Sequence, residues 1–433
     1  MTSTAQPRAG RLERYAVLAG NRGLQALWTA RIVSKVGDWA ARVALITLVF
    51  THTGSALWAG LTTAACYVPW LGPGQLLATL ADRLPHRTVM ASADLARIPV
   101  FVVLALVPLP PAAMVALAVV AAFGDVPFSA AYQASIPLVA RDRYADALVL
   151  MGTTSQVAVL VGYAGGGVLV TVLGCHGVLL LDAVTFAVAA LAVLQVPATR
   201  SGATVTRART HLREAVRIVR SDHLVTICLA VVAVSSLGQM GVESLTVVYA
   251  DHLGWGTGTG AGLLYTVMPL AAVATGLLLP SGGDPLRLVR LVVGLNIALC
   301  LLSVAAFAVL GSTPGGLVGV AAQGVLDMMV TPLYLVAEAR LPTSHRATAF
   351  AFFGGCFMAM QLLGAFGAGL LSELVGIQAA FALACAPTVL LGLATWRLLV
   401  PQPGTRPAPV TTLLPASGAG SPAQAPARVV AAA

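Results

Sequence analysis

The chain has 433 residues, of which 58% are hydrophobic and only 9% charged, and its mean hydropathy is +0.88. Soluble domains carry about 25% charged residues. The composition therefore excludes an ordinary soluble enzyme, a nucleic-acid-binding domain and a disordered chain. Long runs without a charge, such as 98–124 and 291–326, indicate a polytopic helical membrane protein, since one span needs about 20 apolar residues.

Glycine, proline and charged residues divide the chain into twelve predicted spans. Their bounds are 26–50, 57–80, 89–108, 112–138, 147–173, 177–196, 224–250, 258–280, 288–310, 315–338, 347–371 and 377–399. Strands are not expected, because the apolar runs are continuous and longer than a barrel strand. The predicted fold is an all-α membrane protein with twelve transmembrane helices. Its predicted parts are a cytoplasmic segment at 1–25, six-helix bundles at 26–197 and 224–400, a cytoplasmic linker at 198–223 and a disordered cytoplasmic tail at 401–433.

The placement of basic residues tests this topology. Of the 25 Lys and Arg residues, 21 fall in segments predicted to lie on one side of the membrane, and none falls in the six connections on the other side. Because basic loops stay in the cytoplasm, both termini are predicted to be cytoplasmic. All but one of the basic residues are Arg, and with the many Ala, Gly and Val residues this favours a bacterial genome of high GC content. The predicted location is the bacterial inner membrane.

The linker at 198–223 contains a basic stretch with helical spacing. In the stretch 207–220, Leu212, Val216 and Val219 share one helical face, and the adjacent face carries Arg213, Arg217 and Arg220. The stretch is either an amphipathic helix on the inner leaflet or a plain basic linker between the bundles.

The two halves of the chain align with each other without a gap. A shift of 202 residues places Asp82 on Asp284, Asp94 on Asn296, Asp125 on Asp327 and Tyr132 on Tyr334. This pattern predicts two bundles related by a pseudo-two-fold axis along the membrane normal. The substrate site would lie between them, near the midplane.

Three motifs resemble the major facilitator superfamily, in its bacterial drug-exporter-like branch with twelve spans. They are LWTARIVSKVGDWAARVAL at 27–45 in the first span, LADRLPHR at 80–87 with DLAR at 94–97, and GYAGGG at 162–167 in the fifth span. The chain departs from the family pattern at Ala78 and Pro85, where the loop motif has Gly, and at Tyr163, where the fifth-span motif has Pro. The resemblance implies a drug:proton antiporter that works by alternating access.

Four charged residues in the first span need an explanation, since a charge near the bilayer centre costs about 2.5–3.5 kcal/mol. Arg31, Lys35, Asp38 and Arg42 are spaced so that they share one helical face. We expect that face to line the substrate cavity, with Asp38 as a proton-exchanging carboxylate. The alternative is an internal ladder of ion pairs that only fixes helix packing.

A second candidate for proton coupling is Glu243, in a part of the seventh span without basic residues. It lies near Gln239, which corresponds roughly to Asp38 in the first half and is assigned to the substrate cavity. A desolvated carboxyl group can exchange protons near neutral pH. Glu243 could instead bond to a neighbouring helix or lie nearer the outer surface.

The resemblance also implies roles for residues in spans four and ten, which line the cavity in this superfamily. Asp125 and Asp327 are candidates for proton coupling, and Tyr132 and Tyr334 for contact with a lipophilic substrate. The alternative is that each Asp bonds within its own bundle.

Two further groups of residues are assigned by their motifs. The inner-gate group, which in the family locks the two halves together, consists of Asp82, Arg83, Arg87, Asp94 and Arg97. The fifth-span glycines Gly162, Gly165, Gly166 and Gly167 would permit close helix packing.

The favoured function is proton-coupled export of a small lipophilic compound. Import or facilitated movement of a polar or anionic solute is one alternative, and a non-transporting membrane scaffold is another. The segment GTGTG at 256–260 lacks the Gly-Lys-Ser/Thr ending of a nucleotide-binding loop, so ATP is not expected to supply the energy. Neither enzymatic activity nor a cofactor or metal is expected. The expected partners are a small-molecule substrate, protons and the lipid bilayer, and we expect a monomer.

Overall fold

The computed structural model describes residues 20–72, 74, 77, 83–198, 212–278, 284–309, 313–341 and 343–399. All of the elements within these ranges are helical. They are α2 (Arg22–Thr53), α3 (Ala56–Ala65), η1 (Val68–Leu71), α6 (His86–Leu106), α7 (Pro111–Ala140), η2 (Arg141–Arg143), α8 (Tyr144–Val193), α9 (Leu212–Arg220), α10 (His223–Ser244), α11 (Thr246–His252), η3 (Gly256–Gly260), α12 (Ala261–Leu278), α13 (Pro285–Val309), α14 (Thr313–Arg340), α15 (Thr343–Val375) and α16 (Ile377–Leu399). Eight stretches of these described helices are long and apolar enough to cross a membrane. The all-helical membrane fold is therefore confirmed, whereas the number twelve stays a prediction.

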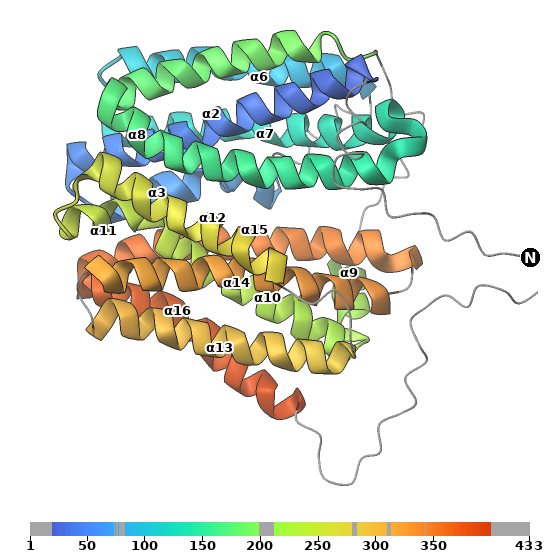
Figure 1. Ribbon diagram of the computed structural model, residues 1–433, viewed down its shortest axis with the longest axis vertical. Coiled ribbons are helices and arrows are strands. Elements are labelled where there is room, and N and C mark those ends of the chain that lie inside the picture. Colours follow the sequence, from blue (N-terminus) through green and yellow to red (C-terminus); the bar gives the residue numbers. More distant parts are fainter. Residues whose placement is uncertain are drawn as a thin grey trace, which may run out of the picture.

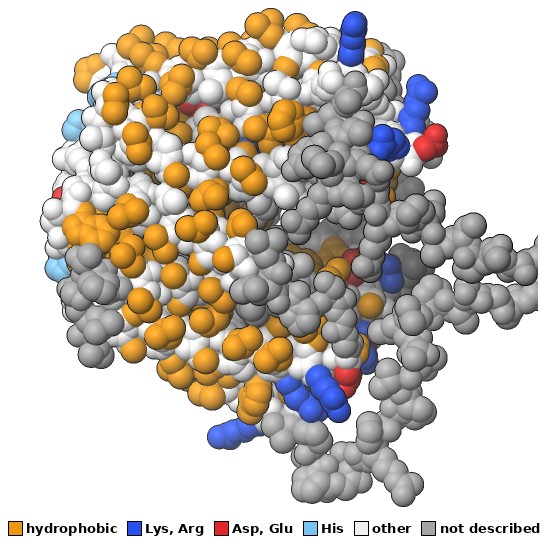
Figure 2. Space-filling view, viewed as in Figure 1, with side chains coloured by type: hydrophobic (Ala, Val, Ile, Leu, Met, Phe, Trp, Pro, Cys, Tyr) orange, Lys and Arg blue, Asp and Glu red, His pale blue; other side chains and the backbone are white. Residues whose placement is uncertain are grey.

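The helices form two bundles (Figure 1). The first half of the chain, α2 to α8, makes one bundle, and the second half, α10 to α16, makes the other. Hydrophobic side chains cover much of the surface between the two ends of the molecule (Figure 2). Lys and Arg side chains gather at one end, which we call the basic end; helix α7 finishes there, just before Arg141. Histidines lie at the opposite end, the histidine end, where α2 and α11 finish with His52 and His252 in their last turns.

Local sequence signals begin and end the helices of the first hairpin. The Asn21 side chain accepts a hydrogen bond from the backbone N–H of Leu24 at 3.1 Å and caps α2. Gly54 ends α2 with a φ of 64°, a left-handed conformation that glycine adopts without strain. Ser55 then caps α3 by accepting from the backbone N–H of Trp58 at 3.3 Å.

Two predicted spans differ from continuous helices. In the predicted span 57–80, α3 ends at Ala65 and a 3-10 turn follows that contains Pro69, which lacks a backbone N–H to continue an α-helix. The predicted span 224–250 is interrupted at Leu245, between α10 and α11. Both interruptions lie close to side chains of the site described below.

Helix α8 contains two predicted spans, 147–173 and 177–196. Its run of helical dihedrals breaks at Gly174, which has φ 72° and ψ 168°. Both ends of α8 belong to the same hydrophobic core, which includes Ala147 and Val193. The chain therefore reverses direction at Gly174, as a hairpin of two spans requires.

The hydrophobic cores differ between the two ends of the molecule. At the basic end each bundle has its own core, one around Leu27 and Tyr132 and the other around Val232 and Phe353. Toward the histidine end, one core combines residues of both bundles, among them Tyr163 and Tyr265. The two halves are therefore packed together at the histidine end.

Glycines allow this close approach at two places. A Cβ at Gly60 of α3 would overlap the carbonyl oxygen of Ala365 in α15. A Cβ at Gly167 of α8 would overlap Gly262 of α12. In addition, the Thr47 hydroxyl donates to the carbonyl oxygen of Thr257 at 3.2 Å. Small side chains thus bring backbones of the two bundles into contact.

A helix forms in the linker between the bundles. It is α9, and its Ile218 and Val219 are buried in the core of the second bundle. The first part of the predicted basic stretch, before Leu212, lies outside the described residues, as do the two terminal segments 1–19 and 400–433.

Candidate functional site

The charged face of α2 lines a cavity in the first bundle. Arg31, Lys35, Asp38 and Arg42 all contribute to its wall, and its volume is about 170 Å³. All four side chains are half-buried. Their helical spacing places them along one wall, because residues three and four apart lie on the same side of a helix.

One end of the cavity wall is mostly charged and the other is mostly apolar, although Arg42 lies only three residues before Leu45 at the apolar end. Arg31 and Lys35 are near the beginning of α2, whereas Leu45 lies ten residues beyond Lys35, about 15 Å further along the helix axis. On α6, Arg97 is likewise followed by Phe101 and Leu104. The apolar end is completed by Ala118, Ala121 and Ala122 of α7.

At the charged end, Arg97 of α6 joins two carboxylates from different helices. Its guanidinium lies 3.6 Å from an oxygen of Asp38 and 3.5 Å from an oxygen of Asp125, and its side chain is only 4% exposed. Arg31 is 3.8 Å from the same Asp125 oxygen and also lies over the ring of Tyr132. Three helices are therefore joined by one network of ion pairs.

Lys35 differs from these neighbours. Among the described residues it makes no ion pair within 4.0 Å, although it lies on the wall between Arg31 and Asp38. It is also the only lysine in the sequence. The cavity thus contains one ammonium group that no carboxylate of the described chain neutralises by direct contact.

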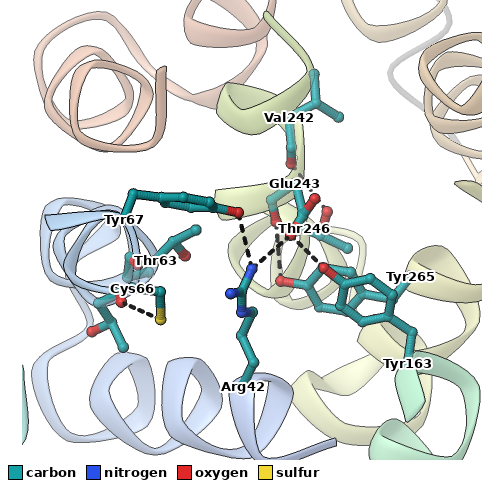
Figure 3. Close-up of polar contacts among 11 residues, drawn as sticks. Arg42, Thr63, Cys66, Tyr67, Tyr163, Val242, Glu243, Thr246 and Tyr265 are labelled. Carbon is teal, nitrogen blue, oxygen red and sulfur yellow. Dashed lines mark hydrogen bonds and ion pairs between the residues drawn. The ribbon is translucent and has the colours of Figure 1, made fainter. Parts of the chain in front are cut away.

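A second polar cluster connects the two bundles (Figure 3). Arg42 of α2 donates to the Tyr67 hydroxyl at 3.0 Å, and its guanidinium lies 3.6 Å from a carboxylate oxygen of Glu243 in α10. The Tyr163 hydroxyl donates to the same Glu243 oxygen, and the Tyr265 hydroxyl donates to the Glu243 backbone carbonyl at 3.0 Å. Glu243 is thus held by α2 and α8 of one bundle and by α12 of its own.

Aromatic rings enclose this cluster. The Arg42 guanidinium lies 4.3 Å from the centre of the Trp39 ring, and the rings of Tyr163 and Tyr265 stack with centres 4.8 Å apart. No sequence motif singles out Tyr67 or Tyr265. The one residue of the cluster that the sequence marks is Tyr163, which stands where the family motif has Pro; its hydroxyl donates to Glu243.

The remaining cavity candidates are not joined to these clusters by ion pairs. Asp327 is exposed and makes no ion pair within the described part of the chain. Gln239 is buried, and its amide nitrogen has no hydrogen-bond partner among the described groups. Tyr132 packs against Phe128, and Tyr334 against an aromatic group that includes Phe353.

The predicted inner-gate residues differ in their surroundings. Asp82 lies outside the described residues, Arg83 is exposed and Arg87 is half-buried. Asp94 is fully buried, and neither of its carboxylate oxygens has a hydrogen-bond partner in the described structure. Arg97 points into the network with Asp38 and Asp125, so it contributes to the cavity.

Of the four predicted packing glycines, some lie in tight helix contacts and one does not. Gly162 and Gly166 lie against α2, where a Cβ would overlap Trp39 and Ala40, and Gly167 lies against α12 of the other bundle. A Cβ on Gly165 would meet nothing within 4 Å. Three of the four therefore occupy tight helix contacts.

Comparisons with known proteins agree with this architecture. The sequence model of the Major Facilitator Superfamily matches residues 27–340. An uncharacterised MFS-type transporter of Bacillus subtilis (strain 168), YfiS, is 23% identical over 402 residues, which cover 86% of this chain and 92% of YfiS.

Among solved structures, the nucleoside transporter NupG matches with a TM-score of 0.67 and 16% identity, covering 86% of this chain and 98% of NupG. A bacterial homologue of the human lysosomal transporter Spinster, in an inward-facing and unoccupied conformation, matches with a TM-score of 0.66 and 14% identity, covering 90% of this chain and 97% of the homologue. A POT family transporter in complex with 5-aminolevulinic acid matches with a TM-score of 0.67 and 12% identity, covering 87% of this chain and 96% of that transporter. At these identities the likeness concerns the fold.

Proposed function

Because the chain belongs to the major facilitator superfamily and is a membrane transporter of that type, we propose that it exports a small, largely apolar compound in exchange for protons. Glu243 is the proposed coupling carboxylate. The observation that carries this proposal is the pairing of Glu243 in one bundle with Arg42 in the other, 3.6 Å apart at the contact between the halves.

The position of this ion pair connects a proton to a movement. An ionised group that loses its partner inside the protein is costly. Separation of the halves at the histidine end would part Glu243 from Arg42, so an ionised Glu243 opposes it. Protonation removes the negative charge and with it the electrostatic attraction to Arg42. The proton affinity of Glu243 would then differ between the closed and the open arrangement of this end, and such a difference is what coupling requires.

The conformation is consistent with one step of alternating access. The bundles share a core toward the histidine end and have separate cores at the basic end. If the basic end faces the cytoplasm, as the distribution of arginine predicts, this conformation is the inward-facing one. The network of Asp38, Asp125 and Arg97 lies in the cavity and would be the second place where protons and substrate meet.

The test is transport by full-length protein reconstituted into liposomes, with an imposed pH gradient and a panel of lipophilic cationic, neutral and carboxylate compounds. We expect protonophore-sensitive, gradient-driven movement of at least one compound by wild type. Glu243→Gln keeps the size of the side chain but cannot exchange a proton, so gradient-driven accumulation should be lost while downhill exchange of the same compound continues.

The matched control is Glu338→Gln, the same change at a side chain that is 52% exposed and paired with Arg346. This variant should accumulate substrate like wild type. Gradient-driven accumulation by Glu243→Gln at the wild-type rate would remove Glu243 from the coupling. A wild-type protein that binds a compound without moving it would favour the scaffold alternative.

A second candidate function is import or facilitated movement of an anionic solute. The observation that favours it is Lys35, a cation on the cavity wall without an ion-pair partner in the described structure. Accumulation of a carboxylate in the opposite direction, with the protons rather than against them, would support this candidate over export.

A further inference from the structure

We infer that the transported compound carries one negative charge, and that its anionic group binds Lys35 while a small apolar group lies along the cavity wall toward Phe101. This inference names the substrate class of the proposed transporter and therefore rests on the proposed function. It is independent of which carboxylate carries the proton and of the direction of transport.

The charges on the cavity wall carry the first step. Four cations line it, Arg31, Lys35, Arg42 and Arg97, against two carboxylates, Asp38 and Asp125. Arg97 lies between both carboxylates, Arg31 shares Asp125, and Arg42 is matched by Glu243 from the other bundle. Lys35 is the cation left without direct contact to an acidic group in the described chain.

An unpaired ammonium group in a membrane protein is costly unless something compensates its charge. A carboxylate or phosphate on the ligand would do so through a charge-assisted hydrogen bond. A cationic ligand would meet the opposite situation, since three arginines line the same cavity and its two aspartates are already paired with them. The site therefore selects for an anion.

The shape of the cavity carries the second step. Beyond Lys35 the wall passes Asp38, Arg97 and Arg42 and then becomes apolar at Phe101, Leu104 and Ala118. The volume of about 170 Å³ is close to that of an engineered apolar cavity of about 150 Å³ that holds benzene. One aromatic ring or a short branched chain would fill this volume, so an arylcarboxylate or a short-chain carboxylate matches it in size.

The experiment measures binding to full-length protein in detergent, without any gradient. The probes are benzoate, phenylacetate and hexanoate, with benzamide and benzylamine as neutral and cationic analogues of matched size. We expect at least one carboxylate to bind tenfold or more tightly than benzamide, and benzylamine not to bind at all. Lys35→Gln should remove the preference for the carboxylate, and Lys35→Arg should keep it.

Arg287→Gln is the matched control, because it removes one positive charge from a side chain that is 85% exposed at the start of α13. It should bind benzoate like wild type. A measurement on wild type alone guards against misfolding of the Lys35 variants: benzoate should slow the reaction of Lys35 with trinitrobenzenesulfonate, and benzamide should not. Mass spectrometry can follow this reaction at one site, since the chain has no other lysine.

Several outcomes would overturn the inference. These are equal or tighter binding of benzamide or benzylamine, unchanged carboxylate preference in Lys35→Gln, and failure of every carboxylate to bind or to protect Lys35. The result is separable from the proposed function. Carboxylate binding at Lys35 without proton-driven transport would leave the inference intact and remove the coupling, whereas proton-driven transport of cations alone would do the reverse.

Discussion

The interiors of the two bundles share a fold and differ in chemistry. In the first bundle, Arg97 joins Asp38 and Asp125 beside a cavity. In the described part of the second bundle, Glu243 is buried and charged, and its partner Arg42 comes from the first bundle. Contacts within the second bundle's own interior join neutral groups: Gln323 donates from its amide nitrogen to the Ser303 hydroxyl at 3.0 Å and to the Cys385 sulfur at 3.3 Å.

Two positions that the internal alignment pairs show the same contrast. Asp94 of α6 and Asn296 of α13 are both buried, and Ser235 donates to the Asn296 side-chain oxygen at 3.3 Å. Neutral hydrogen bonds of this kind stabilise a bundle in one packed state. Ion pairs at a cavity wall can instead exchange partners with a ligand or a proton. The first bundle thus supplies the charged wall of the cavity, and the second contributes Glu243 at the contact between the bundles.

The largest effect is expected from removing Arg97, the cation that Asp38 and Asp125 share. Arg97→Gln leaves Asp38 and Asp125 without their common partner; since both aspartates are about one-third exposed, the cost should lie near the lower end of the range of about 3–5 kcal/mol for a fully buried pair. Thermal unfolding in detergent should show a larger fall in Tm for this variant than for any of the substitutions that follow. Arg287→Gln, at an exposed position, should stay within about 0.5 kcal/mol of wild type.

The contact between the bundles can be tested with one methyl group. Gly167→Ala would place a Cβ against Gly262 of the other bundle, and overpacking of this kind costs about 1–3 kcal/mol. Transport should fall with it, because the closed state at the histidine end needs this approach. Gly165→Ala, two residues away in open space, should leave unfolding and transport unchanged or slightly improved. Equal effects of the two changes would argue against this contact.

The neutral network of the second bundle should be less sensitive than the ion pairs of the first. Gln323→Leu removes the amide but leaves Ser303 its bond to the carbonyl oxygen of Gly319 at 3.1 Å, so the cost should be about 1 kcal/mol. Unfolding and transport assays on the same preparation would measure it. A loss as large as that of Arg97→Gln would erase the distinction between the bundles.

The smallest expected effect lies at the start of the second bundle. Asp222 caps α10 and accepts from Arg340 at 2.7 Å. Partial burial alone would raise the pKa of Asp222, but the hydrogen bonds from Arg340 and from the α10 backbone outweigh it and hold the pKa below its usual value. Its stabilisation is therefore present above the ordinary Asp pKa of about 3.9 and is lost as the pH falls through the lowered value.

Asp222→Ala should thus lower stability by about 0.5–1 kcal/mol at pH 7 and by less near pH 3. Unfolding at the two pH values, with wild type as the reference, measures the difference. A cost that did not shrink on acidification would show that the carboxylate charge is not the source of the stabilisation.

Much of the fold follows from the order of residues along the chain. Apolar runs of spanning length predict helices, and the helices are found, since in lipid every backbone polar group must bond within its own segment. The spacing of Arg31, Lys35, Asp38 and Arg42 also places them on one face, because 3.6 residues make a turn. These are properties of single helices, and they can be predicted from the sequence without knowing which helices pack against them.

The partners across helices could not be read in this way. The motif places Arg97 at a gate but does not reveal its contacts with Asp38 and Asp125. The motif likewise marks Tyr163 as a departure without indicating that its hydroxyl donates to Glu243. The rotation of one helix against another depends on many side chains packing at once, and no single spacing encodes it. The sequence by itself determined that this is a helical membrane transporter with a charged first span. The tertiary structure decided which charges are paired, and that Lys35 has no ion-pair partner among the residues it describes.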